Sequence, residues 1–348
     1  MFNIGRSELA GLSALLLVVL VLFGLTTPRF WSLATFQSMT FQIPELGLLT
    51  LAMLIPILSG GLNLAITFIA NIAGLTMAWV LQSFGGPEAG SLAFIIAIVA
   101  ALGVGALIGW LMGVIVAYTN AHPILVSLAF MIFLHGIGEY LTRGGDISGF
   151  PLFVATMGHG TVAGLPVPLL LFAFCALVWH ILLTRTPLGF SIHMIGSNQR
   201  ASHYAGIDTK RVLTLIYTLS GLMCAVAGIV MLARFNSVRV GHGEAYLLIT
   251  VLACFLGGVD PFGGFGRTVS VVIALVTLQV IATGLNLLGA NQHLATALWG
   301  AFLVMVMVVR WLWTRYRPKE IYDRDRGRPR GPAPPTPPGI RVRTKAVR

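Results

Sequence analysis

Charged residues are scarce in this 348-residue sequence: only 9% are Asp, Glu, Lys or Arg, whereas 57% are hydrophobic. A soluble domain of ordinary composition carries about 25% charged residues. Uninterrupted apolar stretches follow one another along the chain, and about 20 apolar residues suffice to cross the hydrocarbon core of a bilayer. The composition therefore excludes an ordinary soluble domain and predicts an all-α, polytopic membrane protein.

Residues and motifs that carry chemistry are also rare. The three cysteines lie inside apolar runs, and no CxxC or His/Cys pair occurs at metal-ligand spacing, so we expect neither a disulfide nor a metal site. The nucleotide-binding pattern GxxxxGK[ST], the zinc pattern HExxH and the nucleophile pattern GxSxG are all missing. We therefore expect a chain that is not an enzyme, binds no cofactor and has no ATPase site of its own.

Carboxylates are few as well, with 11 Asp and Glu in total. Carriers driven by protons or ions usually place such groups in mid-membrane. Here the pattern puts Glu45 and most of the others at span ends or in loops, and only Glu139 inside a predicted span. Its spacing from His135 favours a helix-stabilising pair over a proton relay. A self-sufficient secondary carrier is thus the weaker interpretation.

Ten apolar segments are predicted to be membrane-spanning helices. Pro56 and the Gly60–Gly61 step, between the second and third segments, predict a broken helix, which membranes tolerate only against protein or a water-lined cavity. Gly60, Gly61 and Asn63 are therefore candidates for the translocation path. The ten segments are 9–27, 43–59, 64–82, 91–119, 122–141, 166–184, 211–233, 245–262, 268–289 and 293–313.

The basic residues predict the orientation, because short cytoplasmic loops collect Lys and Arg. With the N-terminus inside, only four of the 22 basic residues fall outside, and an even number of spans returns the C-terminus to the cytoplasm. We expect a transmembrane domain over 1–313 and a disordered, Arg- and Pro-rich cytoplasmic tail over 314–348. A tail directly after a span is more typical of a membrane-side anchor than of nucleic-acid binding.

Three regularly spaced glycines and two loops give further predictions about helix packing and the connections between spans. Gly105, Gly109 and Gly113 recur every fourth residue, which allows close approach of another helix, either within the subunit or between subunits. The Gly-rich stretch 257–266 predicts a turn. The long polar segment 185–211 is predicted to be cytoplasmic, with a short helix over 198–204 that ends at Gly206. This segment is either a docking element or a solvated connector.

The 185–211 segment, RTPLGFSIHMIGSNQRASHYAGIDTKR, resembles the cytoplasmic loop of ribose-type sugar ABC transporter permeases, a family related to branched-chain amino acid permeases. Three further motifs follow in the family's order: YTLSGLMCAVAGIVMLARFNS at 217–237, LGGVDPFGGFGRTVS at 256–270 and GLNLLG at 284–289. The loop matches the family pattern at Arg185, Thr186, Gly189, Ile195, Gly196, Asn198, Ala201, Gly206 and Ile207.

The resemblance implies a permease subunit of an importer in a bacterial inner membrane. Its expected partners are ATP-binding cassette ATPase subunits, a second permease subunit (identical or homologous) and an extracytoplasmic solute-binding protein. The residues expected to contact the ATPase are Gly196, Asn198, Ala201, Gly206 and Ile207.

Two departures from the family bear on the solute. Asn63, in GGLNLAIT at 60–67, and Ile249, in LITVLA at 248–253, occupy positions that are acidic in the family pattern. A sugar or sugar-like solute is the first hypothesis, and a branched-chain amino acid or nucleoside is the alternative. These departures are explained either by a solute that differs from a typical aldopentose or by a chain that is the divergent member of a permease heterodimer.

Overall fold

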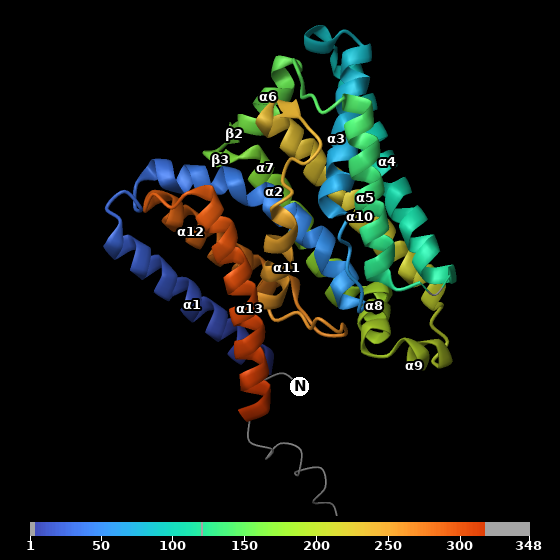
Figure 1. The fold of residues 1–348 in the computed structure, drawn as a ribbon, viewed down its shortest axis with the longest axis vertical. Coiled ribbons are helices and arrows are strands. Elements are labelled where there is room, and N and C mark those ends of the chain that lie inside the picture. The colour runs from blue at the N-terminus through green and yellow to red at the C-terminus, as the bar shows by residue number, and fades with distance from the viewer. Residues whose placement is uncertain (1–3, 120, 317–348) are drawn as a thin grey trace, which may run out of the picture. The chain divides into compact units, whose positions relative to one another are not determined.

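Helices dominate the computed structural model, which describes residues 4–119 and 121–316 (Figure 1). Eight of them are long and apolar enough to cross a membrane. This confirms the prediction of an all-α, polytopic membrane protein. The eight are α1 (Ile4–Thr26), α2 (Leu33–Leu58), α3 (Ile66–Ser83), α4 (Ser91–Thr119), α5 (Pro123–Thr142), α7 (Val167–Arg185), α10 (Thr209–Phe235) and α12 (Thr268–Leu287).

The two remaining predicted spans are also helical. α11 (Tyr246–Leu256) has 11 residues and is therefore only about 16 Å long, roughly half of the hydrocarbon thickness. The expected span 245–262 was too long because its last six residues form a glycine-rich loop before α12. α13 (Gln292–Tyr316) contains a shorter apolar stretch, Ala297–Val308.

Short elements connect the long helices. Two small antiparallel ladders form among the described residues, one between β1 and β4 and the other between β2 and β3. The segment 185–211 contains two helices, of which only the second was predicted. The short elements are η1 (Gly86–Glu88), α6 (Leu152–His159), α8 (Pro187–Ser197), α9 (Gln199–Tyr204), β1 (Ile147–Ser148), β2 (Thr161–Val162), β3 (Leu165–Pro166) and β4 (Ser237–Val238).

Helix α2 is at the centre of the core. Every residue from Ile43 to Leu58 is buried, and the helix runs through Pro44 and Pro56 without ending. Helices α3, α10 and α12 are also largely buried, whereas α1, α4, α5 and α7 expose most of their apolar length. Exposed apolar side chains on spanning helices are suited to contact with lipid.

The glycine repeat of α4 packs against α10. A Cβ on Gly105 would lie 2.6 Å from the Cβ of Ala225, and one on Gly113 would lie 2.9 Å from the Cα of Thr214. Because no side chain fits at these positions, the two helices meet backbone to backbone. The repeat therefore serves contact within the subunit, which the sequence had left open.

Helix α10 separates two ends of the fold. Its 27 residues extend about 40 Å from the α8–α9 segment to the loop over 236–245. We call the end that carries α8 and α9 the coupling end, after the ATPase contact that the sequence resemblance implies, and the end that carries residues 236–245 the opposite end.

Residues 1–306 form one compact unit, and the second unit covers 307–348. Of the second unit, the structure describes the end of α13, up to Tyr316. The predicted tail over 314–348 lies outside the described residues except for its first three.

Candidate functional site

Three loops from distant parts of the sequence meet at the coupling end. Gly264 N donates a hydrogen bond of 2.8 Å to the carbonyl oxygen of Leu58, the last residue of α2. A Cβ on Gly263 would lie 2.8 Å from the Cα of Gly60 and 3.0 Å from the Cα of Gly196. We call Gly60, Gly196, Gly263 and Gly264 the glycine junction. It joins the end of α2, the end of α8 and the loop before α12.

Side chains would not fit within this junction. A Cβ on Gly196 would overlap the Leu58 carbonyl oxygen and the Gly264 amide nitrogen, and both are backbone atoms that cannot swing aside. Gly60, Gly263 and Gly264 also have positive φ angles of 83°, 91° and 83°, a region in which glycine is favoured. The junction is consequently a close-packed backbone contact between three segments.

Helices α8 and α9 are fixed by their own caps. The Thr186 hydroxyl accepts from Gly189 N at 3.2 Å, which starts α8, and Asn198 Oδ1 accepts from Ala201 N at 3.0 Å, which starts α9. Gly206, with φ of 86°, ends the helical turn, and Ile207 N donates to Ser202 O at 3.1 Å. Asn198 is thus a capping residue, whereas Ala201 and Gly206 are exposed at the surface.

Exposed aromatic side chains accompany these helices, and the sequence analysis did not single them out. Tyr204 is 89% exposed and Phe262 is 88% exposed. Asp260 holds the turn that carries Phe262, because its Oδ1 accepts from Phe262 N at 2.9 Å and its backbone N donates to Phe265 O at 2.9 Å. Tyr204 ends α9 and Phe262 lies in the loop before α12, so both exposed rings belong to segments at the same end of the fold.

Asn63 lies in the buried core between α2 and α10. Its Nδ2 donates to Ser220 Oγ at 2.9 Å, and its Oδ1 accepts from Ala65 N at 3.1 Å. Ser220 in turn donates to the carbonyl oxygen of Ala52 at 2.7 Å. The amide of Asn63 therefore ties the break after α2 to α10, while Gly61 faces the hydroxyl of Tyr217.

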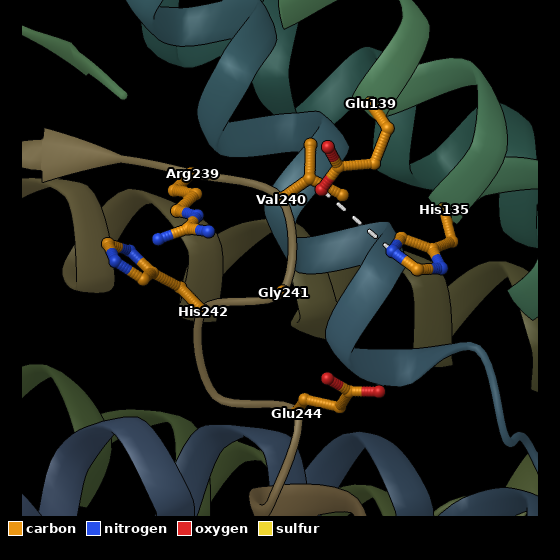
Figure 2. Close-up of a pocket in the computed structure, with 7 residues that line it drawn as sticks. All are labelled: His135, Glu139, Arg239, Val240, Gly241, His242 and Glu244. Carbon is orange, nitrogen blue, oxygen red and sulfur yellow. Dashed lines mark ion pairs between the residues drawn. The ribbon is translucent and has the colours of Figure 1, made fainter. Parts of the chain in front are cut away.

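A polar cavity of about 310 Å³ occupies the opposite end, between α5 and the loop over 236–245. Glu139 and His135 project from α5 towards this loop (Figure 2), with His135 Nε2 at 3.9 Å from Glu139 Oε1. Among the described residues, no three His, Cys, Asp or Glu side chains are placed to hold a metal ion. The lining is formed by His135, Glu139, Arg239, Val240, Gly241, His242 and Glu244.

The loop that lines the cavity is packed against α5 and paired with β1. Val240 contacts Gly138, where a Cβ would lie 2.8 Å from Val240 Cγ2. Burial lowers the pKa of His242; the Asp146 carboxylate opposes this shift and the Arg239 guanidinium adds to it. The cavity therefore presents two carboxylates, a guanidinium and two imidazoles, a lining of hydrogen-bond donors and acceptors rather than of one charge.

Glu45 was predicted to lie at a span end or in a loop, and this prediction is wrong. It lies inside α2 and is fully buried. Residues 33–42 contain Thr, Gln and Ser, which lowered the apolar signal and moved the predicted start of the span to residue 43. Glu45 Oε2 lies 2.8 Å from Arg234 Nη1 and accepts from the Tyr246 hydroxyl at 3.3 Å. The bundle thus contains a buried ion pair that joins α2, α10 and α11.

Together these features define a polytopic membrane protein with close glycine contacts at one end of its bundle and a polar cavity at the other. The sequence model of the family described as the permease component of branched-chain amino acid transport systems matches residues 35–309. The chain belongs to this family, whose members work in general with ATPase subunits and solute-binding proteins. It is accordingly a multi-pass protein of the inner membrane.

Curated relatives agree with the family over nearly the whole chain. The autoinducer 2 import system permease protein LsrD of Photorhabdus temperata is 30% identical over 306 residues, which covers 86% of this chain and 90% of the relative. The proteins of the same name from Yersinia enterocolitica and Escherichia coli K12 are 31% and 30% identical, over 87% of this chain and 91% of each relative. No solved structure is significantly similar to the chain.

Proposed function

We propose that this chain forms the transmembrane path of an ABC importer for a sugar-like solute and that separate ATPase subunits supply the energy. The observation that carries the proposal is the glycine junction, which links the exposed α8–α9 segment to the end of α2. The absence of a nucleotide-binding motif from the sequence is consistent with an energy source on another chain.

An ATPase subunit that binds α8 and α9 could move α2 through the glycine junction. Ala201, Gly206 and the exposed Tyr204 face away from the core and are available to an ATPase subunit. Gly196, at the end of α8, contacts Leu58 and the 262–264 turn directly. Because close-packed contacts transmit displacement with little slack, a movement of α8 reaches the end of α2 and the break that contains Gly60, Gly61 and Asn63.

The relatives' name directs the choice of solute. Their printed name is an autoinducer 2 import permease, and autoinducer 2 is a sugar-like solute. We infer that the second permease copy is identical or homologous, and that an extracytoplasmic binding protein delivers the solute to the opposite end.

Uptake by the reconstituted complex tests this proposal. Inner-membrane vesicles that contain the chain with its ATPase partner and binding protein are supplied with ATP and labelled autoinducer 2, ribose or leucine. We expect ATP-dependent accumulation of autoinducer 2 or ribose and none of leucine. Accumulation of leucine alone would contradict the sugar-like solute and favour the amino acid alternative.

A further inference from the structure

The polar cavity at the opposite end is recessed into the bundle. His135 lies seven residues before the end of α5 (142 − 135), which places it about 10 Å below that end along the helix axis. The centre of its ring is 4.9 Å from that of Phe68, the third residue of α3 and five residues after Asn63 (68 − 63). The cavity therefore lies beside the first turn of α3, directly after the broken segment that contains the candidates for the translocation path.

The polar groups that line the cavity are accessible to a ligand. The side chains of Glu139 and Arg239 are 39% and 56% exposed, and Glu244 is exposed as well. The side chains from α5 and those from the loop lie on different sides of the cavity (Figure 2). A cavity volume of about 310 Å³ is at the lower end of the range for small-molecule sites.

These groups also retain unused donors and acceptors. His135 Nε2 and Glu139 Oε1 are 3.9 Å apart, and Arg239 Nε is 3.7 Å from Asp146 Oδ1. Both distances exceed those of a hydrogen bond. The Glu244 side chain has neither a hydrogen bond nor an ion pair among the described residues. The cavity can therefore bind a polar molecule without first breaking strong contacts of its own.

The loop over 239–244 is held in one shape by its own backbone. His242 N donates to Arg239 O at 3.3 Å, which closes a first turn. Glu244 N donates to Gly241 O at 3.2 Å, which closes a second. β4, directly before the loop, is paired with β1. A preformed site loses less conformational entropy when it binds a ligand.

The lining favours a neutral ligand with several hydroxyl groups. An anion would face the carboxylates of Glu139 and Glu244, and a cation would face the guanidinium of Arg239. A branched-chain amino acid carries both charges, but its apolar side chain would find no apolar surface. Val240 is the only apolar side chain among the described residues that line the cavity, and it is just 3% exposed. Hydroxyl groups both donate and accept hydrogen bonds, and so they match the lining.

We propose that this cavity is the first binding site for the solute within the permease, next to the start of the translocation path. Its ligand is a neutral, polyhydroxylated molecule about the size of one sugar ring. Glu139 and Glu244 accept hydrogen bonds from hydroxyl groups of the solute, and Arg239 donates to another. The inference rests on the proposed function and adds to it the residues that receive the solute.

Direct binding to the permease–ATPase complex tests the site in the absence of the solute-binding protein. The complex in lipid nanodiscs is titrated with ribose, autoinducer 2 or leucine, and binding is followed by ligand-observed NMR. We expect saturable binding of ribose or autoinducer 2 by the wild type. We expect a Kd about tenfold higher for Glu244→Ala, because a hydrogen bond to a charged group is lost. Thermal unfolding should be unchanged, since Glu244 is exposed.

Glu88→Ala is the matched control, because it removes the same carboxylate from an exposed position in η1, outside the cavity. Its Kd should equal that of the wild type. An unchanged Kd for Glu244→Ala, or no saturable binding by a wild-type complex that does transport the solute, would overturn the inference and leave the proposed function intact. Saturable binding of leucine alone would contradict a polyhydroxylated ligand. A wild-type complex without ATP-dependent uptake of ribose or autoinducer 2 would contradict the proposed function itself.

Glu139→Gln separates solute contact from docking of the solute-binding protein. The amide has the shape of the carboxylate but is a weaker acceptor, so we expect the Kd to rise severalfold with unchanged thermal unfolding. Because the titration contains no binding protein, a role in docking that protein would leave the Kd unchanged. An unchanged Kd for both variants, together with reduced uptake from the loaded binding protein, would identify the cavity as a docking surface and overturn the inference.

Discussion

Single glycines determine how closely the segments of this permease approach. Gly105, Gly109 and Gly113 were predicted from their four-residue spacing to allow a close helix contact, and the contact with α10 confirms this. The role of Gly196 could not be read from spacing, because its contacts, Leu58 and Gly264, are distant in the sequence. The burial of Glu45 was missed because the polar residues 33–42 hid the first ten residues of α2. Its pairing with Arg234 could not be read from spacing, since Arg234 is 189 positions away in the chain (234 − 45).

Gly196→Ala tests the glycine junction. The added Cβ would overlap the Leu58 carbonyl oxygen, and overpacking of a close contact costs about 1–3 kcal/mol. We expect a lower thermal unfolding temperature and reduced coupling of ATP hydrolysis to uptake. Gly103→Ala is the control, because nothing lies within 4 Å of its Cβ position, and it is expected to change neither quantity. Wild-type stability and coupling in Gly196→Ala would show that the junction has room to adjust.

At the scale of elements, the apolar runs predicted the positions of the helices more accurately than their first and last residues. All ten predicted spans contain a helix, but α11 is shorter than expected because Gly257 and Gly258 end it. α8 was missed since Pro187, Gly189 and Gly196 are typical of a loop. In the structure Pro187 occupies the first turn of the helix, where its missing N–H costs nothing. α9 was predicted correctly from Asn198 to Tyr204.

Ala201→Glu tests whether α9 docks on the ATPase. Ala201 is exposed, so the substitution leaves the permease's own core untouched but places an unpaired charge in the proposed interface, which costs more than simple overpacking. We expect normal insertion, loss of transport and poor co-purification of the ATPase subunits. Gly206→Asp is also expected to abolish transport, but the φ of 86° at Gly206 strains any side chain there, so Ala201→Glu is the cleaner variant.

Ser83→Glu provides the matched control for this docking test. It adds the same charge at an exposed position on the last turn of α3, towards the opposite end. ATPase co-purification should remain at the wild-type level. If Ala201→Glu also left transport and co-purification intact, residues 185–211 would be a solvated connector.

At the scale of the whole molecule, the segments that meet at the coupling end are all predicted to lie on the same side of the membrane. The glycine junction gathers residues 58–60, 196–197 and 263–264 at one end, and all three were predicted from the alternation of spans to lie on the cytoplasmic side. Which end faces the cytoplasm was predicted from the basic residues alone.

Reporter fusions test the orientation. Fusions after Thr186 and after Tyr316 are expected to report the cytoplasm, and fusions near Gly86 and Gly149 are expected to report the outside. The reason is the strong bias of the basic residues towards one side. An externally exposed 185–211 segment would refute ATPase docking at α8 and α9, because no cytoplasmic ATPase could reach them.

The energy source is the most direct test of the account. The purified chain in liposomes is given labelled solute with ATP or with an imposed proton gradient, alone and together with its ATPase partner and binding protein. Because the chain has no nucleotide-binding motif, we predict no hydrolysis and no accumulation by the chain alone, and ATP-dependent accumulation by the complete complex. Accumulation driven by the proton gradient through this chain alone would contradict the account and identify a secondary carrier.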